Sequence, residues 1–331
     1  MNNSNSLDKI RGMLIGAAIG DSLGSPHEMK YNKKVPYSGF IEIHRRCLSR
    51  FHGSMDLELG QLTDDTEMTL ALTRSLVRNG GYDRDDVVSS YISWANSGSF
   101  MMGKNTKALF HGIKTNKGYE KRYSTVFDPE KVEKWTQSNG CLMRCSPLAL
   151  LKGDEAVIND CKLTNPHIFN IQCCLAYIHG LRAALESKHI IDVIGTVSKS
   201  ITNDSLSELW CSGQNGVILD MTNKESKGWA GFGIYSVSWC LGMYTTFQEA
   251  MDWVIGENIG SDTDTNACIV GAMMGAHLGF DAMCREEKTG HNMSAVLACR
   301  TKNSPLVRPE EYTLGDFYDL TEKMDTLYKS Q

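Results

Sequence analysis

Apolar residues recur at the spacing of an α-helix along most of this chain, and the alternating pattern typical of half-buried strands is scarce. Near the N-terminus, apolar residues three and four positions apart predict a helix over residues 7–23. Glycines recur there every four residues, at Gly12, Gly16 and Gly20, and a row of small residues favours the close approach of a second helix. The chain is therefore predicted to fold as helices packed on helices.

Further helical patterns cover most of the remaining sequence. One helix is predicted from Asp64 or Asp65 to Asn79, where Gly80 supplies a common stop signal. The others are predicted over residues 84–96, 104–113, 130–136, 142–152, 169–187, 190–199, 204–211, 230–242, 246–256, 265–278 and 312–328. Residues 31–62 show no period and are predicted to form a long loop, which inside a compact domain is usually functional or mobile.

No linker rich in glycine, serine or proline divides the chain. We therefore expect one compact all-α domain of several orthogonally packed helices over residues 1–331. Its core is expected over about residues 7–285, followed by a helical C-terminal extension over residues 286–331. The 331 residues are 41% hydrophobic and 22% charged, which is the composition of a soluble globular protein.

Net charge and hydropathy narrow the class of partner. The formal net charge of −5 disfavours nucleic acid and acidic membranes, and we interpret the basic run from Lys117 to Arg122 as a solvated loop. No apolar run approaches the ~18–20 residues that span a bilayer. Residues 12–20 are apolar like the centre of a signal peptide, but Asp21 follows at once, and the helical period explains them better.

The eleven cysteines lie mostly among apolar residues, as at Cys173-Cys174, Cys240 and Cys268. We predict buried free thiols and a reducing, cytoplasmic compartment. Cys141 and Cys145 are close in sequence, but no second pair of cysteines or histidines completes a zinc site.

Two short acidic motifs share one form. Thr63-Asp64-Asp65 and Asp262-Thr263-Asp264-Thr265 each place carboxylates and hydroxyls at the start of a predicted helix. Hard divalent cations prefer oxygen ligands, and carboxylates neutralise their charge. Four acidic groups from two distant segments would suit a centre of two metal ions.

Helix capping is the alternative interpretation of the same residues. Asp and Thr are preferred N-caps, and Asp64 and Glu67 have the spacing of an N-cap and the third residue after it. A helix needs only one cap, however, and like charges crowded at one helix start repel each other unless a cation is present. Spacing alone leaves both interpretations open.

Five segments carry further short patterns, in a fixed order along the chain. They are Gly16 to Gly24 followed by Glu28, Gly60 to Met68, Ser138 to Arg144 with Pro147, Thr164 to His167, and Gly260 to Thr265. Together they resemble the ADP-ribosylglycohydrolase family. The resemblance as a whole covers residues 12 to about 279, because it includes the small residues that flank the first and last segments. The combination of the two acidic motifs is far more specific to that family than either motif alone.

The resemblance implies a compact all-α fold of the ADP-ribosylglycohydrolase type with two divalent cations, Mg²⁺ or Mn²⁺. Carried over by position, the metal ligands would be Thr63, Asp64, Asp65, Asp262, Asp264 and Thr265. The candidate catalytic residues are Glu28, on a loop beside the metals, together with Asp64 and Asp65. The substrate would contact Asn139, Gly140, Asn165, Gly260 and Ser261.

Two positions depart from the family pattern. Asn165 replaces a histidine, so it can donate a hydrogen bond but cannot titrate, and Ser261 replaces a glycine where the backbone would approach the ligand. His167 is equally consistent with a structural histidine. Trp135 and Tyr235 are candidate adenine platforms, although aromatic residues in helical stretches belong more often to the core.

The implied reaction is hydrolysis at C1″ of the distal ribose of an ADP-ribosyl adduct, through an oxocarbenium-like transition state. Asp64, Asp65 or Glu28 would take the proton of the water, and the sequence leaves that choice open. Helix-start amides near Asn139 would suit the pyrophosphate. The expected partner is an ADP-ribosylated protein or a small ADP-ribosyl compound, with no membrane or nucleic acid involved and a monomer as the default.

Two other functions remain open from the sequence. One is a non-catalytic binder of ADP-ribose with the same fold. The other is a two-metal hydrolase that cleaves a nucleotide pyrophosphate. The linkage that would be cleaved, to arginine, serine, a nucleic-acid base or an ester, is not determined by these residues.

Overall fold

The computed structural model describes residues 3–28, 57–134, 136–186, 189–221, 227–258, 261–302 and 306–331. Within these ranges the regular structure is helical, and the sole β-pairing is an isolated bridge between Ser138 and Trp229. The predicted all-α fold is therefore confirmed. Most of the predicted loop at 31–62 lies outside the described residues, as do Trp135 and Gly260.

The elements follow the chain as a series of α-helices with short 3₁₀ turns, labelled η, between them. In order they are α1 (Asn3–Gly24), η1 (Ser25–His27), α3 (Asp64–Asn79), α4 (Arg84–Ala95), α5 (Lys104–Phe110), α6 (Asn116–Val126), η2 (Pro129–Lys134), η3 (Asn139–Cys141), η4 (Ser146–Leu150), α7 (Glu155–Lys162), α8 (Ile168–Glu186), α9 (Ile190–Ser200), α10 (Asp204–Gln214), α11 (Ala230–Met243), α12 (Phe247–Asn258), α13 (Thr263–Leu278), α14 (Phe280–Arg285), α15 (Glu287–Ala298), η5 (Glu310–Tyr312) and α16 (Phe317–Ser330).

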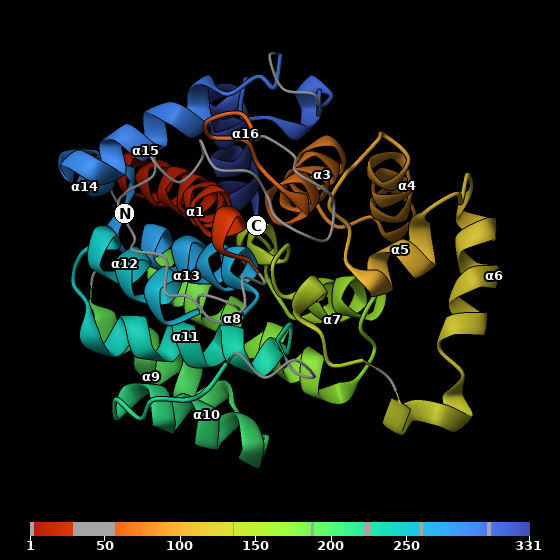
Figure 1. Cartoon of the computed structure of the whole chain (residues 1–331), viewed down its shortest axis with the longest axis horizontal. Helices are drawn as coiled ribbons and strands as arrows, with labels where there is room; N and C mark the ends of the chain where they lie inside the picture. The colour runs from red at the N-terminus through yellow and green to blue at the C-terminus, as the bar shows by residue number, and fades with distance from the viewer. Residues whose placement is uncertain are drawn as a thin grey trace.

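Helices α1 and α13 form the centre of the molecule and lie side by side (Figure 1). They run antiparallel with their backbones in contact, because a β-carbon at Gly16 would overlap the carbonyl of Gly271 and one at Gly12 would overlap the carbonyl of Gly275. The predicted role of the glycine row in close helix packing is thus confirmed. The antiparallel contact carries the C-terminal end of α1 to the N-terminal end of α13.

Other helices cover this central pair on several sides. Helices α8 and α11 pack against α13, and α9 and α10 pack outside them (Figure 1). Helix α3 lies beside α1, with α4 and the C-terminal α16 against it (Figure 1). One large hydrophobic core runs through these contacts, so the ends of α1, α3 and α13 are fixed relative to one another.

Helix α8 corrects one expectation about apolar runs. By length and composition it could cross a membrane, although the sequence had suggested no run of that kind. In the structure 67% of its most apolar stretch is buried inside the protein, against α7, α9 and α13. Burial of this extent is typical of the core helix of a globular protein.

The predicted solvated loop at Lys117 to Arg122 is wrong, because these residues belong to α6. Thr115 caps the helix by accepting a hydrogen bond from the amide of Gly118 at 3.1 Å. The ring of Tyr119 is buried and stacks on Phe110, with 5.0 Å between ring centroids. Tyr123 and Val126 pack on the core beside it, so the apolar face of α6 is Tyr119, Tyr123 and Val126, and most of this face lies beyond the basic run from which the loop was predicted.

The predicted helix over 142–152 is also wrong, since the chain forms the short turn η4 in that segment. Pro147 lacks an amide hydrogen and clashes with the carbonyl four residues earlier, so an α-helix cannot continue through it. The predicted helix at 130–136 is the 3₁₀ turn η2. Helices α7 and α14 were not predicted, and both are short and only partly buried. Helix α15 lies within the helical extension predicted over residues 286–331.

The cysteines are free thiols wherever the structure describes them, and eight of those ten are buried. The predicted buried thiols at Cys173, Cys174, Cys240 and Cys268 are confirmed. The sulfur atoms of Cys141, Cys161 and Cys174 lie within 4.8 Å of one another. Their spacing in the sequence did not indicate that these three cysteines would be neighbours. Burial raises the pKa of Cys141 and Cys161, which keeps both in the thiol form.

Candidate active site

Three helix ends converge at one place in the molecule. The end of α1 meets the start of α13, where a β-carbon on Gly24 would overlap the backbone of Asp264. The start of α3 joins them through Asp21 of α1. Its carboxylate accepts hydrogen bonds from the amide of Thr63 at 3.0 Å and from the hydroxyl of Thr63 at 2.6 Å. The two acidic motifs predicted from the sequence are therefore brought together.

Asp21 also supplies the N-terminal cap of α3. Its carboxylate accepts a hydrogen bond from the amide of Thr66 at 3.2 Å. Thr63 occupies the N-cap position without a side-chain cap bond, so the predicted cap by Asp64 and Glu67 is wrong. At α13 the N-cap residue Asp262 likewise makes no side-chain cap bond.

Two groups of three carboxylates share one member. Oxygen atoms of Asp21, Asp65 and Asp264 lie within 4.8 Å of one another, and so do those of Glu28, Asp262 and Asp264. Asp264 belongs to both groups. This arrangement gives two adjacent positions, each surrounded by three acidic side chains, with Asp264 between them.

Asp64 lies at the edge of the same cluster. Its carboxylate accepts a hydrogen bond from the amide of Gly103 at 3.3 Å. Burial, together with the negative charges of Asp21 and Asp262, raises the pKa of Asp64 to about 7. The carboxyl of Asp64 can therefore gain or lose a proton near neutral pH.

Burial raises the pKa of the other carboxyl groups as well. The pKa values of Asp21, Glu28, Asp65, Asp262 and Asp264 are all above the ordinary range for this reason. Neighbouring negative charges add to the rise at Glu28, Asp65 and Asp264. The cluster therefore resists carrying its full negative charge unless a cation compensates it.

The residues at this cluster fit hard divalent cations. Asp65 Oδ1 is buried and has no hydrogen-bond partner among the described residues, which leaves an acidic oxygen available for a ligand. Thr63 donates its hydroxyl hydrogen toward acidic oxygens of Asp21 and Asp65, so lone pairs of its oxygen remain free. The atoms available to bind a metal ion are carboxylate and hydroxyl oxygens, which Mg²⁺ and Mn²⁺ prefer as ligands. Thr265 is buried beside them, and its amide donates to Asp264.

Asn139 contacts the acidic cluster directly. Its side-chain amide donates a hydrogen bond to Asp262 at 2.8 Å, and its backbone amide donates to the carbonyl of Gly228 at 2.8 Å. The expected helix start with free amides near Asn139 is not found. The segment is a three-residue 3₁₀ turn, and the amide of Asn139 is already engaged.

Asn165 supports the segment that carries Asn139. Its side-chain amide donates to the carbonyl and to the hydroxyl of Ser138, both at 3.0 Å. Asn170 donates to the same carbonyl at 2.7 Å. Asn165 is fully buried, so in this chain the residue that replaces a histidine holds the backbone next to Asn139.

The remaining predicted substrate residues are placed as follows. Gly140 is half-buried, and its carbonyl accepts a hydrogen bond from Arg144 at 2.7 Å. Ser261 is fully buried, and its hydroxyl lies 3.5 Å from the carbonyl of Lys227. The side chain of Ser261 is therefore accommodated inside the protein. Gly260 lies outside the described residues.

An aromatic wall stands near the Ser138 segment. Trp229 stacks on Phe169 with 5.1 Å between ring centroids, and its indole N–H donates to Gln137 at 2.9 Å. His167 is half-buried, and a ring nitrogen lies 3.4 Å from the amide nitrogen of Gln137. Tyr235, in contrast, is buried with its hydroxyl donating to the carbonyl of Val217, which places it in the core.

Comparison with known proteins agrees with these motifs. The sequence profile of the ADP-ribosylglycohydrolase family matches residues 2–291. This chain belongs to that family. Members of the ADP-ribosylglycohydrolase family hydrolyse ADP-ribose linkages. The family assignment made from the five sequence segments is confirmed.

Individual relatives of the family are distant but span most of the chain. The chain is 28% identical over 309 residues to a protein of Acanthamoeba polyphaga mimivirus named as a candidate ADP-ribosyl glycohydrolase, covering 83% of this chain and 88% of the relative. It is 25% identical over 280 residues to the ADP-ribosyl-[dinitrogen reductase] glycohydrolase of Rhodospirillum rubrum, covering 83% and 87%. A solved structure described as an ADP-ribosylglycohydrolase-related protein complex shares the fold, with a TM-score of 0.64, 20% identity and coverage of 98% and 99%.

Sequence reasoning in this family member missed three residues that shape the site. The first is Asp21, which directly follows an apolar helical run, a position where a buried acid needs a partner or a ligand. The second is Arg144, which is fully buried against Asp160. The third is Lys227, which had no signal of its own in the sequence; its positive charge offsets part of the rise in pKa that burial causes at Glu28 and Asp262.

Proposed function

We propose that this protein hydrolyses the bond at C1″ of the distal ribose of ADP-ribosyl adducts, at a centre of two divalent cations, Mg²⁺ or Mn²⁺. The observation that carries the proposal is the pair of carboxylate triads that share Asp264. One cap by Asp21 satisfies the start of α3, so helix capping alone would leave the crowding of the other acids unexplained.

The proposed ligands are the acids of the cluster together with the hydroxyls of Thr63 and Thr265. Asp21 would act on the cations partly through Thr63, since it accepts the hydroxyl hydrogen and so turns the oxygen lone pairs toward the centre. Asn139 would hold Asp262 in the same way, by donating to the outer oxygen of that carboxylate. When bound, such cations supply electrophilic chemistry, because they polarise the oxygen atoms that they contact.

Asp64 is the proposed general base. Its carboxylate lies at the edge of the cluster, where it accepts a hydrogen bond from the amide of Gly103 at 3.3 Å, and a base must lie within reach of the water that it deprotonates. Its side chain is half-buried at the edge of the cluster, so water can reach it. Glu28 is half-buried beside Asp262 and Asp264 and is the second candidate for proton transfer.

The proposed substrate is an ADP-ribosylated protein or a small ADP-ribosyl compound. The Rhodospirillum rubrum relative is named for its action on ADP-ribosyl dinitrogen reductase, which supports a modified protein as the substrate class. Negative charge around the centre would attract a cationic leaving group such as a guanidinium more than an anionic one. An N-glycosidic adduct of arginine is therefore the first substrate to test, followed by O-glycosidic adducts of serine.

The test is a panel of defined ADP-ribosylated peptides assayed with Mg²⁺, with Mn²⁺ and after EDTA treatment. We expect release of intact ADP-ribose that requires the cation and is abolished by Asp64→Ala or Asp262→Ala. Release of AMP would instead show pyrophosphate cleavage. Affinity for ADP-ribose without turnover on any substrate would show a binding protein. Full activity after complete metal removal would contradict the two-cation centre.

Glu28→Gln separates two roles of the second candidate base. If Glu28 transfers a proton, the variant should keep its divalent cations while turnover falls. If the variant loses a cation as well, Glu28 is a ligand. Metal content measured by elemental analysis beside the turnover rate distinguishes these results.

A further inference from the structure

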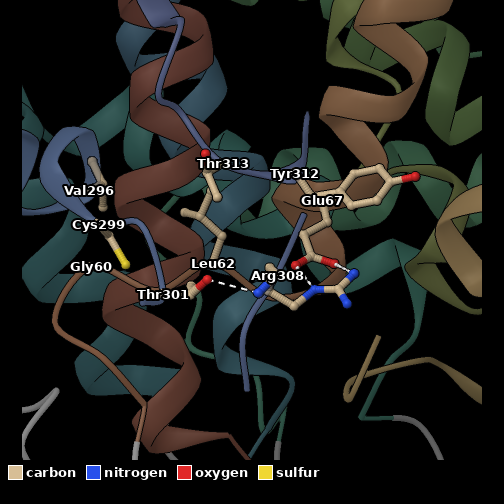
Figure 2. Close-up of a pocket in the computed structure, with 9 residues that line it drawn as sticks. All are labelled: Gly60, Leu62, Glu67, Val296, Cys299, Thr301, Arg308, Tyr312 and Thr313. Atoms are coloured by element: carbon tan, nitrogen blue, oxygen red, sulfur yellow. Dashed lines mark hydrogen bonds and ion pairs between the residues drawn. The ribbon is translucent and has the colours of Figure 1, made fainter. Parts of the chain in front are cut away.

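A buried ion pair joins the C-terminal segment, residues 306–331, to the first turn of α3, the helix that carries Asp64 and Asp65. Arg308 lies beyond residues 2–291, the part of the chain that matches the family profile. Its guanidinium nevertheless faces Glu67 inside a small pocket, with Tyr312 beside the pair (Figure 2). Both side chains of the pair are about 1% exposed.

The geometry of this pair is bidentate. Arg308 donates from Nε to Glu67 Oε1 at 2.6 Å and from Nη2 to Glu67 Oε2 at 2.9 Å. Two further guanidinium N–H groups donate to the carbonyl and hydroxyl of Ser97 at 2.9 and 2.8 Å. The indole of Trp94 donates to Glu67 Oε2 at 2.8 Å. These hydrogen bonds hold the Arg308 guanidinium and the Glu67 carboxylate in one geometry, and they therefore fix the position of Glu67.

Glu67 stands one helical turn from the start of α3. Its backbone amide donates to the carbonyl of Thr63 at 3.0 Å, which closes the first turn of the helix. That turn carries Asp64 and Asp65 of the acidic cluster. A shift of Glu67 would therefore displace the carboxylates that belong to the proposed cation centre.

The same C-terminal segment also holds the chain just before α3. The side-chain amide of Gln61 donates to the carbonyl of Leu306 at 3.2 Å, and the carbonyl of Gln61 accepts from Ser22 of α1 at 3.1 Å. Gly60 adopts a φ of 81°, and a β-carbon there would overlap the backbone at Ala295 of α15. The C-terminal segment thus contacts both the approach to α3 and its first turn.

We propose that Arg308 is a positioning residue for the cation centre: through Glu67 it holds the first turn of α3 at the spacing that two divalent cations require. This inference rests on the proposed function, because it assigns a role toward those cations. The family profile ends before Arg308, so the role falls to a part of the chain that the family motifs do not include.

A second ion pair provides a matched control. Arg74, also on α3, donates to both carboxylate oxygens of Asp316 at 2.7 Å and to the carbonyl of Glu311 at 2.9 Å. It links the same helix to the same C-terminal segment, but it lies farther along α3, away from the acids. Loss of this pair should weaken the attachment of the segment without displacing the acidic cluster.

The experiment compares wild type, Arg308→Met and Arg74→Met by titration with Mn²⁺ alone, with free Mn²⁺ followed by electron paramagnetic resonance. We expect the dissociation constant to rise about 10-fold in Arg308→Met, at the lower end of the loss caused by removing outer support from a metal site, because the first turn of α3 is no longer held in place. Arg74→Met should bind Mn²⁺ as wild type does, even if its melting temperature falls. Added Mn²⁺ should restore much of the turnover of Arg308→Met, because the defect lies in cation affinity.

Glu67→Gln and the double variant Glu67→Leu/Arg308→Met keep the inference testable if Arg308→Met does not fold. The double variant removes both charges and so avoids an unpaired buried ion. Its Mn²⁺ affinity should fall as in Arg308→Met. Unchanged affinity in every folded variant, with wild type binding Mn²⁺, overturns the inference alone. Failure of wild type to bind Mn²⁺ or Mg²⁺ would instead overturn the cation centre of the proposed function.

Discussion

Two groups of buried charges in this molecule are built in opposite ways. Arg144 and Asp160 are both fully buried, and they pair at 3.1 Å with Tyr91 donating to the same carboxylate at 2.7 Å. The acidic cluster at the ends of α1, α3 and α13 is also buried, but it gathers six carboxyl groups around shared space. The first group is complete as folded, whereas the second would be completed by the proposed cations.

This difference teaches how to recognise a site among buried charges. A buried ion pair satisfies its own electrostatics, so it positions the backbone around it; Arg144 donates to the carbonyl of Gly140 and to the hydroxyl of Thr164. A buried group of like charges destabilises the fold that contains it and persists when a ligand compensates it. Substitutions in the two groups should therefore change stability in opposite directions.

The largest expected effect follows from removing the Arg144 guanidinium, the positive charge of the buried pair with Asp160. Arg144→Met should lower the free energy of unfolding by about 3–5 kcal/mol, because Asp160 would remain buried and unpaired. Urea denaturation monitored by circular dichroism measures this. The double variant Arg144→Met/Asp160→Leu should recover much of the loss. A single variant as stable as wild type would show that the pair is not the structural element described here.

The second effect has the opposite sign and concerns the incomplete group. In metal-free protein at pH 8.5, Asp65→Asn should raise the free energy of unfolding by roughly 1–3 kcal/mol, since it removes one of several repelling buried charges. Asp160→Asn, the same substitution in the complete group, should destabilise the protein and serves as the matched control. If both substitutions destabilise to the same extent, the contrast between the two groups is wrong.

The smallest expected effect is a dependence on pH. Burial raises the pKa of the clustered carboxyl groups, to about 7 for Asp64, above the ordinary value of 3.8 in the unfolded chain. The folded metal-free protein then binds more protons than the unfolded chain between those values, so its stability falls as pH rises through this window. From pH 6 to pH 8 the free energy of unfolding should fall by about 1 kcal/mol or more.

Saturating Mn²⁺ supplies the control for the pH experiment. A cation stabilises the deprotonated carboxylates, so metal binding releases protons and its stabilising effect grows as pH rises. The stability of the Mn²⁺-loaded protein should therefore fall less between pH 6 and pH 8, or rise. A pH slope that Mn²⁺ leaves unchanged would place the responsible groups elsewhere in the molecule.

Much of the fold could be predicted from local pattern. The bounds of α3 follow from its apolar period and from Gly80, which adopts the left-handed conformation with a φ of 67°. The glycine row of α1 indicated a close helix contact, although not that α13 would be the partner. The failures have two causes: at Lys117 to Arg122 the basic run hid the apolar face of α6, and at 142–152 one proline outweighed the apolar period.

The site could be predicted only in part, because its most informative contacts join distant segments. The acids of the two motifs were found from their types and spacing, and the structure brings them together. The cap that Asp21 gives to α3 joins positions 42 and 45 residues apart. The pair between Glu67 and Arg308 spans 241 residues. No local pattern encodes either contact, since both depend on which helices become neighbours.

The glycine contact between α1 and α13 also limits how the site can change over evolution. Its glycines recur every four residues on α1, so the next equivalent alignment of the two helices is four residues away, about 6 Å along the axis. Smaller offsets would drive side chains into carbonyl groups. The relative position of Asp21 and Asp264 therefore cannot drift by small steps. Lineages that keep this contact inherit the spacing of the acids unchanged, and divergence in specificity must come from residues around the centre.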